Sequence, residues 1–428
     1  MAESTASLLR AQWRNPAEVS SVLLIIGGDV VRMAFSQGAG TRFVPVCFSF
    51  GCVAYAFTGI VNILGDGRLL SPPDYNCKLI NLDSGYARTS NNFVLSRILR
   101  DLEAMESRPN FKPRSKSSDR ERGQADDSDD DYAIRITVYE ALKNRRAATE
   151  FGMGFPHLVA LVVSLLQICL SLVPWFLNGA HRWNVLFITL TGIFLVQCTG
   201  WVPQWTAEKL PNRQNSSQTF ALTSGNGSRE VMVIFGNGQC LDLEALASTQ
   251  TPRNGRSWEK FPSLAYDPQK EKDGKYIRKA KLFPTTPFRG VPLGFVITQI
   301  SFACLSVLWI LLLINVSAPT VFPEGWCFIG VGALGMFQNA WLAAREISPR
   351  MRNMPLKRTG QIRAKKVMDG IMDFHMSFQL GVPLRNEFFP GDLREEEEEW
   401  WNGTMGPYDA RRKQLGRTPY QAMPTPDT

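Results

Sequence analysis

Histidine is scarce in this chain of 428 residues, which contains only three: His157, His181 and His375. Imidazoles so few and so far apart argue against a histidine-rich metal centre. The eight cysteines show no spacing that would indicate a zinc site or a disulfide framework. We therefore expect no metal ion and no metal cofactor.

The chain also lacks any stripe of basic residues interleaved with aromatic residues, although its formal net charge is +8. Such a stripe is the usual footprint of a nucleic-acid site, so we expect no nucleic-acid partner. An excess of positive charge also suits a surface that faces anionic lipid headgroups. A lipid bilayer is therefore the first partner to consider.

Charge is nearly absent from five apolar blocks: residues 43–64, 156–177, 183–203, 293–317 and 321–343. Each block has about 20 to 25 residues, the length that crosses the hydrocarbon layer as a helix. Backbone groups in lipid must be paired within the protein, which favours helices. Core helices of a soluble protein would show a polar stripe instead. The blocks predict transmembrane helices.

A sixth span is predicted over residues 19–37, although it contains Asp29 and Arg32. The two charged residues are three positions apart, so they can pair on one face of a helix. A signal peptide is a poor alternative, because no small-residue cleavage site follows a clean apolar core.

The distribution of basic residues predicts the topology. Six spans leave short connections at residues 38–42, 178–182 and 318–320, and only Arg42 and Arg182 of the 47 lysines and arginines lie in them. Basic flanks stay in the cytoplasm. We expect both termini and all long loops to be cytoplasmic. Without a retrieval signal, the endoplasmic reticulum is the default membrane.

The long loops predict some structure of their own. Residues 93–106 repeat apolar positions at helical spacing, which suits either an interfacial helix or a helix packed on a cytoplasmic domain. Residues 107–131 are polar and predict disorder. Residues 134–139 alternate like a strand, and residues 219–235 resemble a hairpin around a Gly/Asn turn. We predict that they share one sheet, and that the C-terminal tail is helical around residues 362–378.

The predicted fold is therefore mainly α: a polytopic transmembrane bundle of about six spans with a small cytoplasmic β-sheet. Three transmembrane hairpins alternate with cytoplasmic segments. The hairpins cover residues 19–64, 156–203 and 293–343, and the cytoplasmic segments cover residues 1–18, 65–155, 204–292 and 344–428.

Gly330, Gly332 and Gly335 spell GxGxxG. A dinucleotide site needs a strand before this motif and a helix after it. Here the motif lies inside the last apolar block, where small residues let helices approach closely. We interpret the glycines as packing positions and expect no bound cofactor.

Polar residues in or beside the spans are the remaining candidates: Asp29, Arg32, Asn62, Asp66, Gln167, Gln197, Gln299, Gln338 and Asn339. Hydrogen bonding between helices is the simpler interpretation of the amides. A carboxyl in an apolar pocket has a raised pKa and can act as a general acid. Asp29 and Asp66 are thus candidate catalytic acids, and Arg32 would favour the ionised form of Asp29.

The runs LIIGGDVVRMAFSQGAG, GDGRLLSPPDYNCKLINLDSGYAR, TGWVPQW and FFPGDLREEEEEWW resemble a family of fungal polytopic membrane proteins. Most members have no assigned function, and some belong to secondary-metabolite gene clusters. The membrane-bound terpene cyclase of the ascofuranone pathway is similar. The resemblance implies acid-initiated cyclisation of an epoxidised prenylated substrate, with aromatic faces stabilising the cation. The aromatic candidates are Phe35, Phe48, Phe50, Tyr55, Phe57, Trp175 and Trp201.

Two other functions compete with an enzyme. A membrane scaffold would bind partner enzymes through the predicted sheet and the acidic tail. A small-molecule transporter ranks third, because the sequence shows no convincing inverted repeat or pair of broken helices.

Overall fold

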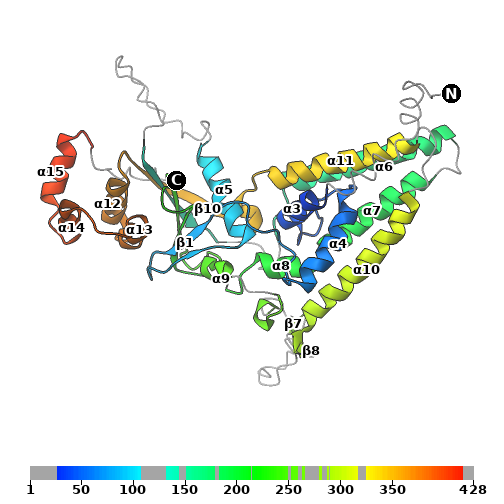
Figure 1. Ribbon diagram of the computed structural model, residues 1–428, viewed down its shortest axis with the longest axis horizontal. Coiled ribbons are helices and arrows are strands. Elements are labelled where there is room, and N and C mark those ends of the chain that lie inside the picture. Colours follow the sequence, from blue (N-terminus) through cyan, green and yellow to red (C-terminus); the bar gives the residue numbers. More distant parts are fainter. Residues whose placement is uncertain are drawn as a thin grey trace, which may run out of the picture. The chain divides into compact units, whose positions relative to one another are not determined.

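The computed structural model describes residues 27–107, 132–143, 151–178, 183–213, 215–248, 252–258, 263–265, 279–281, 287–288, 290–316 and 324–417. The protein is mainly helical and divides into two compact units (Figure 1). The helical unit comprises Met1–Ser71, Arg146–Asn212 and Gln250–Arg345. The sheet unit comprises Pro72–Arg145, Arg213–Thr249 and Glu346–Thr428. Residues 19–26 of the first predicted span and residues 108–131 of the predicted disordered loop lie outside the described residues.

Three helices of the helical unit are long and apolar enough to cross a membrane: α6 (Phe155–Asn178), α10 (Leu293–Val316) and α11 (Glu324–Ala344). A fourth apolar helix, α7 (Asn184–Gly200), has 17 residues. Large apolar side chains such as Leu161, Leu165 and Ile314 are exposed on these helices. Apolar outer faces suit contact with lipid, as expected of a multi-pass membrane protein.

One continuous helix over residues 43–64 was predicted, and that prediction is wrong. Helix α3 covers Gly28–Gly38 and helix α4 covers Gly51–Leu64, but residues 44–49 form neither helix nor strand. We call residues 44–49 the inserted segment. Helix α3 packs on α11 and α4 packs on α10, so the two short helices lie between the long ones (Figure 1).

The inserted segment is buried throughout, and amide side chains satisfy its backbone. Gln197 accepts from the Val44 N–H at 2.9 Å and donates to the Val44 carbonyl at 3.0 Å. Asn339 forms the same pair of bonds with Cys47, both at 2.9 Å. Gln167 donates to the Phe48 carbonyl at 2.7 Å. The amide side chains of the apolar blocks thus bind the backbone of the inserted segment, which is not helical. The predicted hydrogen bonding between helices describes only part of their role.

Glycines of α7 and α11 make room for the same segment. A Cβ atom on Gly335 would lie 1.8 Å from the Phe48 carbonyl oxygen, and one on Gly332 would lie 2.1 Å from the Phe50 ring. Gly192 of α7 faces Phe48 in the same way. The glycines of the GxGxxG run are therefore packing positions, as predicted.

The connection after α3 lies at the end of the unit where α7 finishes. Gly40 donates its N–H to the Gly200 carbonyl at 3.1 Å, and Trp201 Nε1 donates to the Arg42 carbonyl at 2.9 Å. Residues 38–42 were predicted to lie at the opposite end, beside Asn178 and Asn184. That placement is wrong, because the inserted segment turns the chain back.

The sheet unit contains a six-stranded mixed sheet in the order β10-β3-β5-β4-β1-β2. The predicted hairpin forms β4 (Thr219–Thr223) and β5 (Glu230–Phe235), and the predicted strand β3 (Ile134–Ala141) pairs with β5 in parallel. The single predicted sheet is thus confirmed. The sequence analysis missed three strands: β1 (Lys78–Asn81), β2 (Ala87–Thr89) and β10 (Leu356–Ala364).

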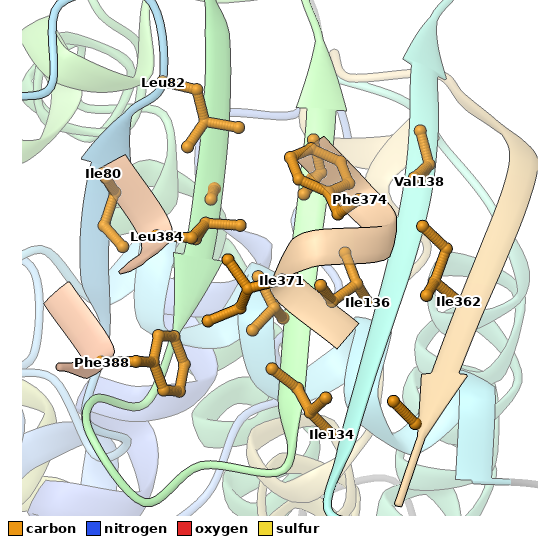
Figure 2. Close-up of a cluster of buried hydrophobic side chains, with 14 residues drawn as sticks. Ile80, Leu82, Ile134, Ile136, Val138, Ile362, Ile371, Phe374, Leu384 and Phe388 are labelled. Carbon is orange, nitrogen blue, oxygen red and sulfur yellow. The ribbon is translucent and has the colours of Figure 1, made fainter. Parts of the chain in front are cut away.

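Helices cover both faces of this sheet. On one face, α12 (Val367–Phe378) and α13 (Gly381–Phe388) pack Ile371, Phe374 and Leu384 against the strands (Figure 2). On the other face, Arg135 and Tyr139 of β3 hydrogen-bond to Glu106 of α5 (Phe93–Ser107). Helix α5 therefore packs on a domain. Of its two predicted roles, this is the second, and the first was an interfacial helix. The tail helix begins at Val367, because residues 362–364 belong to β10.

The remaining elements are short. They are α8 (Gln204–Lys209), α9 (Leu243–Ala247), η2 (Gly255–Trp258), β6 (Ser263–Ala265), β7 (Lys279–Lys281), β8 (Pro287–Phe288), β9 (Val291–Pro292), η4 (Pro349–Arg352), α14 (Glu395–Trp401) and α15 (Gly406–Gln414).

We predict that Asn339→Leu destabilises the helical unit. The change leaves the Cys47 N–H without an acceptor and removes the amide donor of the Cys47 carbonyl, which keeps only the weak bond from Cys52 Sγ among the described residues. The loss should cost about 2 kcal/mol of unfolding free energy. Scanning fluorimetry in detergent should show a lower unfolding midpoint, and the buried Cys47 thiol should react faster with a maleimide.

Asn315→Leu is the matched control, because Asn315 is exposed and, within the described ranges, bonds only to Leu311 of its own helix. Equal midpoints for the two variants would contradict the role given to Asn339.

Candidate functional site

The two carboxyls proposed as acids lie in exposed positions. Asp29 is in the first turn of α3, and Asp66 follows the end of α4. Arg32 does not need Asp29 as a partner, because its Nη2 donates to the Leu70 carbonyl at 2.9 Å. Neither aspartate is buried in apolar surroundings. The structure thus does not gather Asp29, Asp66 and Arg32 into one buried site.

A different carboxyl, Glu208 of α8, is buried in the helical unit. Its Oε1 accepts from the Leu69 N–H at 2.8 Å and from Gln204 Nε2 at 2.7 Å, and its Oε2 accepts from the Leu70 N–H at 2.9 Å. Burial raises the pKa of Glu208, and the donated hydrogen bonds and Arg68 oppose that rise. Two carboxylate oxygens offer about four acceptor positions, so one position on Oε2 stays open to a proton.

Three buried polar atoms near Glu208 have no hydrogen-bond partner among the described residues: Arg32 Nε, Tyr55 Oη and Gln204 Oε1. Tyr55 is 1% exposed and Gln204 is fully buried. Arg32 and Glu208 both bond to the backbone of Leu70, and Phe35 stacks on both Tyr55 and Trp205 of α8, so these groups share one neighbourhood. Buried polar groups are normally satisfied. Unsatisfied donors and acceptors beside a buried acid therefore mark a candidate ligand or reaction site.

Aromatic rings form one side of this neighbourhood. Phe35 stacks on Tyr55 at 5.1 Å and on Trp205 at 5.8 Å, and Phe302 meets Tyr55 edge-on at 6.4 Å between ring centroids. We name Arg32, Phe35, Tyr55, Gln204, Trp205 and Glu208 the Tyr55 cluster. Of the seven aromatic residues predicted to line a chamber, Phe35, Phe48, Phe50 and Tyr55 are buried, and Phe57, Trp175 and Trp201 are exposed.

Helix α8 organises the cluster by binding two other segments at once. Lys209 donates to the Ala39 carbonyl at 2.6 Å and to the Phe35 carbonyl at 3.3 Å, at the C-terminal end of α3. A cation there complements the free carbonyls and the dipole of the helix. The neighbouring Glu208 binds the N–H groups of Leu69 and Leu70. Adjacent charges of opposite sign thus hold α3 and the chain after α4 together.

The sequence analysis missed Glu208 because it lies just after the apolar block 183–203. A charged residue is ordinary at that place. The one available signal was the i, i+4 pair of Gln204 and Glu208 directly after a predicted span.

Across the described ranges, no group of three or more His, Cys, Asp or Glu side chains is arranged to hold a metal ion. Comparison of the chain with protein-family models, with curated proteins and with solved structures finds no significant match.

We predict that Glu208→Gln destabilises the helical unit. An amide has one acceptor oxygen and a donor NH2, so at least one of the Leu69 and Leu70 N–H groups loses its acceptor. An unsatisfied buried N–H costs about 1–3 kcal/mol, which thermal unfolding in detergent would measure as a lower midpoint. Asp66→Asn makes the same chemical change at an exposed position nearby and should leave the midpoint unchanged. Equal unfolding midpoints for Glu208→Gln and Asp66→Asn would contradict the structural role given to the Glu208 carboxylate.

Proposed function

We propose that this chain is a multi-pass membrane enzyme that begins the cyclisation of an apolar, epoxide-bearing prenylated substrate by proton transfer from the Tyr55 cluster. One observation carries the proposal: the Tyr55 hydroxyl has no partner among the described residues and is buried among aromatic rings that connect it to α8, the helix of the buried Glu208. Acid-initiated cyclisation needs a proton donor away from water and aromatic faces for the developing cation.

The reaction balances without a cofactor. A proton passes to the epoxide oxygen, and the adjacent C–O bond breaks to leave a carbocation. The π electrons of an alkene in the substrate then form a new C–C bond. Loss of a proton from the cyclised cation regenerates the acid, so the product is an isomer of the substrate. In this proposal Glu208 holds the proton, Tyr55 delivers it, and the rings of Phe35 and Trp205 stabilise the cation.

The same proposal includes a topology. Helices α6, α7, α10 and α11 cross the bilayer, and the chain from α3 to α4 returns to the side where α7 and α11 end. Segments that precede α6, follow α7 or follow α11 then share that side, which the basic flanks assign to the cytoplasm. The sheet unit is built from such segments. This arrangement would leave the sheet unit in the cytoplasm, where partner enzymes can bind.

Cysteine accessibility tests the topology. Arg42 and Trp183 are exposed residues near opposite ends of α7. With Cys169, Cys198 and Cys304 replaced by alanine, we expect an impermeant maleimide to label Arg42→Cys in sealed microsomes. Trp183→Cys should be labelled only after permeabilisation. If Arg42→Cys is labelled only after permeabilisation, this topology is wrong, and the chain before residue 65 contains the two complete spans that the sequence predicted.

The catalytic proposal is tested with microsomes from a host that expresses the chain. Epoxidised prenyl-phenols are added, and mass spectrometry looks for a new isomer of unchanged mass. Tyr55→Phe keeps the ring stack and removes only a hydroxyl without a partner, so a structural role predicts no loss of stability. A catalytic role predicts a loss of rate of about 100-fold or more. The wild-type rate should also fall as the pH rises through the raised pKa of Glu208, because only the protonated acid donates.

Asp29→Asn and Asp66→Asn are the matched controls and should keep their activity. Loss of activity in either, with Tyr55→Phe active, would move the acid back to the exposed carboxyls. A folded, inserted protein that converts none of the substrates would sink the enzyme proposal and favour a membrane scaffold.

A further inference from the structure

A cavity of about 160 Å³ lies in the sheet unit where α14 and α15 meet the start of α12. Five basic side chains line it: Lys366, Arg394, Arg411, Arg412 and Arg417. The acidic lining consists of Glu396 and Glu397. We name this feature the arginine cavity.

The inner basic groups are held in place by buried acids. Arg412 binds both carboxylate oxygens of Asp373, at 2.7 and 2.6 Å, and Arg417 donates to Asp369 at 3.1 Å. Lys366 pairs with Glu397 and donates to the Tyr408 hydroxyl at 3.1 Å. These bonds fix the wall of the cavity before any ligand arrives, which lowers the entropy that binding must overcome.

Two basic groups remain exchangeable. Arg394 is the N-cap residue of α14, and its exposed side chain makes no capping hydrogen bond. Arg411 pairs with Glu396, but their side chains are 60% and 46% exposed. An exposed ion pair contributes little free energy, so Arg411 can leave Glu396 for an anion that binds both arginines.

The charge balance favours such an anion. The lining has five cations against two carboxylates, and Arg412 and Arg417 already pair with Asp373 and Asp369 behind the wall. Guanidinium groups bind phosphate through paired, charge-assisted hydrogen bonds. The cavity is smaller than the ~300–1,000 Å³ typical of sites for drug-sized ligands. It suits a single phosphate group better than a whole nucleotide.

We propose that the arginine cavity binds a phosphate-bearing anion, with Arg394 and Arg411 as the side chains that close on it. The phosphate belongs either to a soluble phosphorylated compound or to a phospholipid headgroup. This inference does not rest on the cyclase proposal, because it concerns residues of the other unit.

Hydrogen–deuterium exchange of the full chain in nanodiscs tests the inference. In phosphatidylcholine discs, inorganic pyrophosphate is titrated against potassium chloride of equal ionic strength. A second set of discs contains phosphatidylinositol 4-phosphate and no soluble phosphate. We expect slower exchange in α14 and α15. Protection by pyrophosphate alone identifies a soluble ligand, protection by the lipid alone identifies a headgroup, and protection by both shows that the phosphate group itself is recognised.

The variant Arg394→Gln/Arg411→Gln should weaken binding about 100-fold, because each of the two lost charge-assisted bonds is worth about a tenfold change. Lys413→Gln is the matched control: Lys413 is exposed on α15 and does not line the cavity. Unchanged exchange in β10 will show that the variants fold. No protection in either set of discs, or equal protection in the double variant and the wild type, would overturn the inference.

Discussion

The helical unit depends on one constraint: the inserted segment is buried without a helix to pair its backbone. In an apolar interior each unpaired N–H or carbonyl costs about 1–3 kcal/mol, so other groups must supply the bonds. Gln167, Gln197 and Asn339 do so from three different helices. The same helices need glycine where the segment passes, as at Gly335. Amide side chains and glycines that are far apart in the sequence thus meet the same requirement, which is to accommodate the buried inserted segment.

The Tyr55 cluster follows from this constraint. Because the inserted segment turns the chain back, the end of α3 and the residues after α4 both meet α8. Adjacent residues Glu208 and Lys209 can then bind the N–H groups of one and the carbonyls of the other. Charge is buried at this place because Lys209 binds the carbonyls at the end of α3 and Glu208 binds the backbone N–H groups of the chain after α4. Glu208, the carboxyl proposed to hold the catalytic proton, therefore also links two segments of the chain.

The sequence predicted the elements whose signals are local. Alternating apolar residues and a Gly/Asn turn were enough for β3, β4 and β5, and long apolar blocks with almost no charge were enough for α6, α10 and α11. The break before α4 could not be predicted from hydropathy, because residues 43–64 are apolar whether helical or not. Strand β10 was missed since its pairing with β3 joins residues more than 200 positions apart. Glu208 was missed because its burial depends on α3 and the chain after α4.

The pairing of β10 with β3 also governs how the protein can be made. Strand β3 emerges from the ribosome before α6, and its partner β10 is synthesised only after α11. The eight positions of β3 that pair with β10 must wait for four apolar helices to leave the ribosome. Unpaired strand edges invite association with other chains. During synthesis, the edge of β3 that pairs with β10 therefore stays unpaired for a long interval, and a chaperone that binds this edge would protect it.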